Sequence, residues 1–166
     1  MTTPIKPASS VPPPTGIARW CSFLVADRCF AVDAGSVAEV LRATTVNRVP
    51  LAAAAIAGLL NLRGRIVPVI DMRLRLGFPP APAEQRRINL VVDIRNEWYS
   101  LLVDDLLDVT SYDTSQIEPP SGSRSAAALD AVVGLLPAAD RLVHLLDPAR
   151  ILQSLIATRV RGLSVG

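Results

Sequence analysis

The feature that most constrains the fold is an internal repeat. Residues 58–71 align with residues 134–147 without a gap, and six of the fourteen positions are identical. Apolar runs match by chance in a chain rich in Leu and Val, but the identities here include a glycine, an arginine and an aspartate. A weaker match aligns 32–40 with 103–109, each with Val-Asp followed by an acid-Val pair. The repeat predicts two similar halves with the same order of elements.

Each half consists of short apolar runs separated by polar or glycine-containing connections, a pattern typical of β-hairpins. Strands are expected over 20–25, 29–32, 37–42, 56–62, 65–71, 87–94, 98–103, 106–109, 132–136 and 141–146. About five antiparallel strands hide their edges best by curling into a small barrel, because open edges invite aggregation. Pro68 cannot donate to a ladder and indicates an edge strand or a bulge. The prediction is a mostly β protein with two similar five-stranded β-barrel subdomains.

Short helices complete the predicted fold. Asp147 as N-cap and Pro148 as first helical residue indicate a C-terminal helix that runs to about residue 160. Further short helices are expected at 72–76 and in the alanine-rich segment 51–55. Residues 1–17, rich in proline, are expected to be a disordered tail. The domain is therefore placed at 18–160, as two intertwined β-barrel lobes with the second over roughly 87–147, and a C-terminal tail is placed at 161–166.

Charge and hydropathy exclude several classes of partner. The 17 basic and 15 acidic residues give a net charge of +2, so no strong field attracts nucleic acid or an anionic membrane. No segment reaches the roughly 20 uncharged apolar residues of a membrane span, and the start has no signal-peptide pattern. The expected location is the cytoplasm. Two cysteines, Cys21 and Cys29, are expected to be buried and reduced rather than part of a disulfide framework or zinc set.

A search for catalytic and metal-binding groups gives few candidates. His144 is the one histidine, and the two cysteines are distant from it in sequence, so no metal set and no cofactor site is expected. Asp104 and Asp105 form a carboxylate pair that suits acid/base work or simple turn chemistry. The chain is predicted not to be an enzyme. A carboxylate-dependent enzyme stays open as an alternative that requires both side chains to face one pocket.

The segment 61–71, preceded by Val49-Pro50 and by residues 56–58, resembles the signature of the CheW-like chemotaxis coupling family. The resemblance covers about residues 18–160. It implies an SH3-like fold of two barrels and an adaptor that couples methyl-accepting chemoreceptors to a CheA-type histidine kinase. The implied partners are the receptor's cytoplasmic tip, the kinase's homologous regulatory domain and other CheW-like domains in array rings. The same scaffold in a non-flagellar pathway, with second-messenger or surface-behaviour output, stays open.

The resemblance also implies a partner-binding site. Its residues are Val37, Glu39, Gly58, Asn61, Leu62, Arg63, Gly64, Leu106 and Val109. Glu39 and Arg63 match an acid and an arginine that pair across the first barrel. A deeply buried pair would cost about 3–5 kcal/mol to break, whereas an exposed one is worth roughly 0–1 kcal/mol. The apolar positions of this set suit either partner contact or the core, and exposure decides between them.

Overall fold

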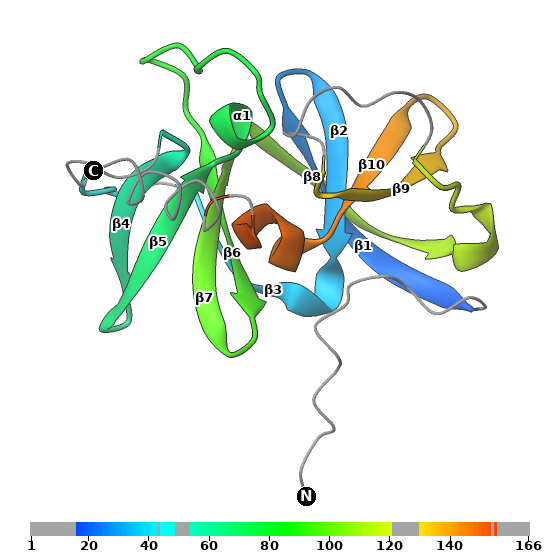
Figure 1. The fold of residues 1–166 in the computed structure, drawn as a ribbon, viewed down its shortest axis with the longest axis horizontal. Coiled ribbons are helices and arrows are strands. Elements are labelled where there is room, and N and C mark those ends of the chain that lie inside the picture. The colour runs from blue at the N-terminus through cyan, green and yellow to red at the C-terminus, as the bar shows by residue number, and fades with distance from the viewer. Residues whose placement is uncertain (1–15, 43, 49–53, 121–129, 154, 156–166) are drawn as a thin grey trace, which may run out of the picture.

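The computed structural model describes residues 16–42, 44–48, 54–120, 130–153 and 155, which form two five-stranded sheets side by side (Figure 1). The elements are β1 (Ile17–Val25), β2 (Arg28–Asp33), the 3-10 turn η1 (Ala34–Ser36), β3 (Val37–Leu41), β4 (Ile56–Leu62), β5 (Arg65–Asp71), α1 (Met72–Arg75), β6 (Ile88–Ile94), β7 (Glu97–Val103), β8 (Asp105–Asp113), the 3-10 turn η2 (Thr114–Gln116), β9 (Val132–Pro137) and β10 (Leu142–Leu146). Sheet A has the order β8-β1-β2-β10-β9, and sheet B has β3-β6-β7-β5-β4. The predicted mostly β fold with two five-stranded units is confirmed.

The two sheets have the same topology, which confirms the internal repeat. In sheet A, Leu145 of β10 lies beside Ala31 of β2 in a parallel pair, and in sheet B, Val69 of β5 lies beside Ser100 of β7 in the same way. The alignment of 58–71 with 134–147 sets Val69 opposite Leu145. Ala31 is the fourth residue of β2, as Ser100 is of β7. Strand β10 is therefore the counterpart of β5, and β2 is the counterpart of β7.

The repeats exchange strands between the sheets. The first repeat supplies β1 and β2 to sheet A but β3, β4 and β5 to sheet B, while the second supplies β6 and β7 to sheet B and β8, β9 and β10 to sheet A. The range 87–147, expected to be a second lobe, therefore contributes strands to both sheets. The strand ladder of neither sheet closes into a ring within the described part of the chain.

The matched aspartates of the repeat start matched helices. The Asp71 N–H donates to the Ala55 carbonyl at 2.7 Å, and the Asp147 N–H donates to the Ala131 carbonyl at 3.0 Å, so the same bond recurs in the second repeat. Each Asp side chain accepts a hydrogen bond from the N–H two residues on, at 3.0 Å, and so caps the next helical turn. Residues 148–153 are helical, which confirms the predicted start, and the predicted end near 160 lies outside the described residues, as does most of 51–55.

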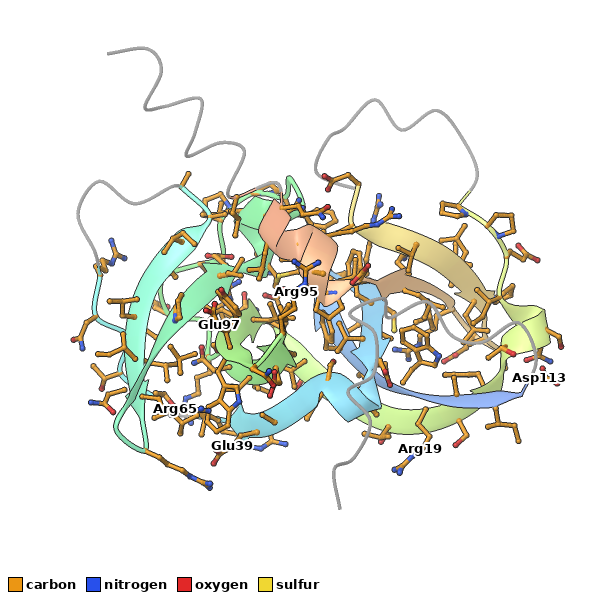
Figure 2. All side chains as sticks on the ribbon, turned by 60° about the horizontal axis from the view of Figure 1, so that its bottom comes forward. Arg19, Glu39, Arg65, Arg95, Glu97 and Asp113 are labelled. Atoms are coloured by element: carbon orange, nitrogen blue, oxygen red, sulfur yellow. The ribbon has the colours of Figure 1, made fainter. Side chains whose placement is uncertain are left out.

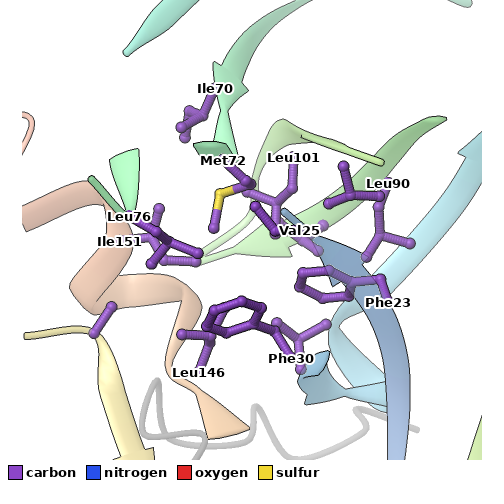
Figure 3. Close-up of a cluster of buried hydrophobic side chains, with 14 of the residues drawn as sticks. Phe23, Val25, Phe30, Ile70, Met72, Leu76, Leu90, Leu101, Leu146 and Ile151 are labelled. Atoms are coloured by element: carbon purple, nitrogen blue, oxygen red, sulfur yellow. The ribbon is translucent and has the colours of Figure 1, made fainter. Parts of the chain in front are cut away.

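Three groups of buried side chains hold the sheets together. The largest lies between the two sheets and joins Phe23 and Phe30 of sheet A to Leu90 and Leu101 of sheet B (Figure 3). Ile151 of the C-terminal helix covers this shared core. Sheets A and B each have a smaller core of their own on the other face. The alternation of side chains along each strand thus serves two cores at once.

Pro68 occupies a different place from the expected one. Its strand β5 is not an edge strand, because it lies between β4 and β7. Pro68 pairs with Leu59 of β4, and the pairing of β5 with β7 begins one residue later, at Val69. The proline is tolerated in an interior strand because it stands just outside the ladder on that side.

Candidate functional site

The four residues of the sequence signature form a well-defined hairpin turn at the surface. Arg63 and Gly64 have positive φ values of 53° and 80°, as a two-residue type I′ turn between β4 and β5 requires. The Asn61 carboxamide oxygen accepts a hydrogen bond from the Gly64 N–H at 3.1 Å, which fixes the turn. Leu62 is buried in the core of sheet B. The turn therefore presents the Arg63 side chain to solvent on a fixed backbone.

Glu39 and Arg63 meet, as expected, but at the surface. The Arg63 guanidinium donates to a Glu39 carboxylate oxygen at 3.3 Å. The Arg63 side chain is 72% exposed and that of Glu39 is 25% exposed. The Glu39–Arg63 ion pair is therefore an exposed pair and not a buried one. Glu39 of β3 and Arg65 of β5 both belong to sheet B and are labelled near one another in Figure 2, beside the turn that Glu39 contacts through Arg63.

The exposed pair is expected to contribute little to stability. Exchanging Glu39→Gln and Arg63→Gln singly and together should give a coupling of at most about 1 kcal/mol, because solvent screens the two charges. Urea unfolding of the four proteins measures it. A coupling of about 3 kcal/mol, the range of a buried pair, would show that the pair is buried in solution.

The apolar site positions divide between the sheets. Val37 on β3 pairs with Val92 of β6, and Leu106 on β8 pairs with Phe23 of β1, so the two occupy equivalent places in sheets B and A. Both are half-buried against the shared core. Val109, also on β8, is 51% exposed. Val37 and Leu106 therefore pack against the core and are also partly accessible to a partner, and Val109 is accessible.

Exposure separates the remaining site positions. Asn61 and Gly64 are exposed, whereas Gly58 and Leu62 are buried. The structure gathers Glu39 and the turn residues at one end of sheet B, and it places Leu106 and Val109 on an edge strand of sheet A. The predicted residues therefore form two separate surfaces. Gly58 and Leu62 support the first of them from within the fold.

Sequence reasoning missed the apolar and aromatic surroundings of the turn. Ile66, opposite Asn61 in the hairpin, is 65% exposed. The Arg65 guanidinium lies 4.2 Å above the ring of Trp98, which belongs to β7. An arginine followed by isoleucine directly after the turn was the available signal. The contact with a tryptophan from another strand depends on the sheet topology, which no local pattern supplies.

Asp104 and Asp105 have different surroundings. Both Asp104 carboxylate oxygens accept from the Arg73 Nε, at 3.0 and 2.9 Å, and one accepts from the Ala26 N–H at 2.8 Å. Asp105 is exposed, and its side chain accepts from the Leu106 N–H at 2.8 Å. One carboxylate is thus held by arginine in a nearly buried cluster, and the other bonds to the start of its own strand at the surface. The two carboxylates therefore share none of these hydrogen-bond partners.

The Asp104 cluster ties the two sheets together. Arg87 contributes a second guanidinium, with its Nε 3.4 Å from Asp104 and two bonds of 3.0 and 2.8 Å to Asp71. Burial by itself raises the pKa of Asp104, but the hydrogen bonds from Arg73 and Ala26 and the positive charges of Arg73 and Arg87 outweigh it, so this pKa lies below its usual value. The carboxylate links the β1–β2 turn of sheet A to α1, which follows β5 of sheet B.

Comparisons with known proteins agree with this geometry. A family model described as the CheW-like domain matches residues 19–155. The "Probable chemotaxis protein CheW" of Rhizobium etli is 30% identical over 126 residues, which are 76% of this chain and 81% of that protein. The "Protein PilI" of Pseudomonas aeruginosa is 29% identical over 90 residues, 54% of this chain and 51% of that protein.

A solved structure shows the same fold. The crystal structure of the scaffolding protein TtCheW from Thermoanaerobacter tengcongensis has a TM-score of 0.71 and 27% sequence identity, and the match covers 78% of this chain and 88% of that chain. None of the helices in the described ranges has the length and apolar character needed to cross a membrane.

Proposed function

This chain belongs to the CheW-like domain family, and on that premise we propose that it is a cytoplasmic adaptor that couples methyl-accepting chemoreceptors to a CheA-type histidine kinase in a chemosensory array. The observation that carries the proposal is the family match from residue 19 to 155, which spans both sheets. The proposal assigns the chain no catalysed reaction and no cofactor. Its partners are the receptor's cytoplasmic tip, the kinase's regulatory domain and other CheW-like domains in the array.

Two separate surfaces support this role. An adaptor must hold two partners at once, and so it needs docking faces that do not overlap. The β4–β5 turn with Arg63 and Glu39 lies on sheet B, and the partly exposed residues of β8, Leu106 and Val109, lie on sheet A. A charged pair at one place and partly exposed apolar side chains at the other suit protein contacts of two different kinds.

Replacement of Arg63 tests the first surface. Arg63→Ala is expected to leave a folded chain and to weaken binding to the receptor tip or to the kinase domain about tenfold. This effect lies between that of an arginine at the rim of an interface and that of a hot-spot arginine. Arg95→Ala is the matched control, because Arg95 is also an exposed arginine with positive φ at the first position of a two-residue turn. Calorimetric titration of each variant with each purified partner measures the effect. Equal affinities for Arg63→Ala, Arg95→Ala and the unaltered chain would remove Arg63 from the site.

A second candidate keeps the fold and changes the pathway. This candidate is a scaffold for a non-flagellar chemosensory system, and it is proposed because the relatives include one named "Protein PilI" beside the chemotaxis proteins. Deletion of the gene separates the two: loss of directed swimming supports the flagellar pathway, and intact swimming with altered surface behaviour or second-messenger level supports the other.

A further inference from the structure

Because the two sheets are repeats of one another, equivalent residues at the tips of their hairpins can be compared. In sheet B, the Arg65 guanidinium stacks on the Trp98 ring. The alignment of 58–71 with 134–147 makes Arg141 the counterpart of Arg65. Cys29 is the second residue of β2, as Trp98 is of β7, so these two are counterparts as well. Sheet A therefore keeps the cation and has a small thiol side chain where sheet B has the ring.

An open cavity lies at this place in sheet A. It has a volume of about 630 Å³ and lies between the β1–β2 and β9–β10 tips, where Leu24, Cys29, Arg141, Leu142 and His144 line it. Arg141 and Leu142 are exposed. A cavity of this size accommodates a large side chain with room to spare. We call the cavity lined by these five residues the tip notch.

We propose that the tip notch binds an aromatic side chain of a partner protein, which lies against Arg141 as Trp98 lies against Arg65. The inference rests on the proposed adaptor role, because a protein that docks partners uses such anchors. Aromatic residues seated in pockets dominate the energy of many protein interfaces.

The chemistry of the notch favours an aromatic ring over other side chains. Leu24 and Leu142 supply apolar walls. The Arg141 guanidinium donates to the Asp140 carboxylate at 3.4 Å through one nitrogen, and this exposed cation also attracts the face of a π system. The charges at the rim balance: Asp27 and Asp140 accompany Arg28 and Arg141 in the lining. An acidic or basic ligand therefore meets no net opposite charge, whereas a neutral ring gains both apolar burial and the cation contact.

Titration of the ¹⁵N-labelled full chain with N-acetyl-tryptophanamide tests the proposal. The expected result is saturable chemical-shift change in the millimolar range at Cys29, Leu142 and His144, with no such change from N-acetyl-leucinamide. Arg141→Ala should weaken binding roughly two- to fivefold, the range of one exposed cation–π contact. Arg65→Ala removes the matched arginine of sheet B and should leave probe binding unchanged.

A second variant, Cys29→Trp, places a tryptophan ring of the chain itself in the tip notch. Cys29→Trp is expected to abolish probe binding by filling the notch, and the exposed Arg141→Ala keeps the test valid if this core variant fails to fold. Shifts that are absent, equal for both probes, or unaffected by Arg141→Ala would overturn the proposal. Because the titration contains no receptor or kinase, its outcome is independent of whether those partners bind, and a failed notch leaves the adaptor role to its own test.

Discussion

Gly58→Ala is expected to lower the free energy of unfolding by about 3 kcal/mol or more, because overpacking and backbone strain, each about 1–3 kcal/mol, add together there. A Cβ added at Gly58 would lie 2.2 Å from the backbone oxygen of Asn47. The φ of Gly58 is +153°, a backbone conformation that residues with a side chain rarely adopt. The backbone of Asn47 cannot move aside as the end of a flexible side chain can. The Gly58→Ala variant is therefore expected to give no soluble protein if the destabilisation exceeds the stability of the fold. Gly58 lets the segment at Asn47, which pairs with Leu59, cross close to β4.

Two further glycines provide graded controls in urea unfolding. At Gly134, the repeat counterpart, an added Cβ meets the Ile117 side chain at 2.8 Å, and side chains adjust. At Gly64, φ is +80° and no atom lies within 4 Å, so alanine should cost only about 1–2 kcal/mol of left-handed backbone strain. Alanine is therefore expected to destabilise the fold most at Gly58 and less at both Gly134 and Gly64. A Gly58→Ala protein as stable as Gly64→Ala would show that the close approach to Asn47 is absent in solution.

Asp104→Ala is expected to cost about 3 kcal/mol of stability, the second large effect, because it breaks a nearly buried ion pair by removing one partner. The Asp104 side chain is 9% exposed and lies between Arg73 and Arg87, which are 16% and 11% exposed. Removal of the carboxylate leaves two guanidinium groups with fewer acceptors and an Ala26 N–H without its bond. Asp105→Ala is the matched control and should change stability by less than about 0.5 kcal/mol, because that residue is exposed. Equal unfolding midpoints for the two variants would contradict the cluster.

The same carboxylate predicts a pH dependence. The pKa of Asp104 is lowered in the folded chain, so its stabilising contribution is complete above the ordinary carboxyl value of about 4 and is lost as pH falls through the lower folded value. Unfolding free energies measured from neutral pH down into the acid range should therefore fall less steeply below about pH 4 for Asp104→Asn than for the unaltered chain. Identical slopes would show that the folded state does not lower this pKa.

Local patterns predicted most of the fold. Apolar runs and polar turns located the strands, and Asp147-Pro148 located the start of the C-terminal helix. The repeat correctly predicted two matched sheets. The lobes were expected to be intertwined, but the repeat did not say which strands cross from one lobe to the other, because similarity between segments says nothing about which strands pair. Pro68 was expected at an edge strand or a bulge, but a proline can also stand in an interior strand where it lies just outside the ladder.

The candidate site shows the same division. The signature predicted a turn at Arg63 and Gly64, which follows from residue types and spacing, and the family resemblance supplied Glu39 as the partner of Arg63. Burial did not follow, because the 72% exposure of Arg63 depends on how the hairpin projects from sheet B. The tip notch was equally hidden from the sequence, since only the sheet register reveals that Cys29 takes the place of Trp98.

Bridging of two partners by this chain is measured most directly in a capture experiment. The cytoplasmic tip of a chemoreceptor from the same organism is immobilised, and binding of the cognate kinase's regulatory domain is recorded by interferometry with and without the full chain. Kinase capture is expected to require the chain, to saturate with its concentration and to weaken with Arg63→Ala. Kinase capture that is unchanged by the chain, or a chain that binds neither protein, would contradict the adaptor function.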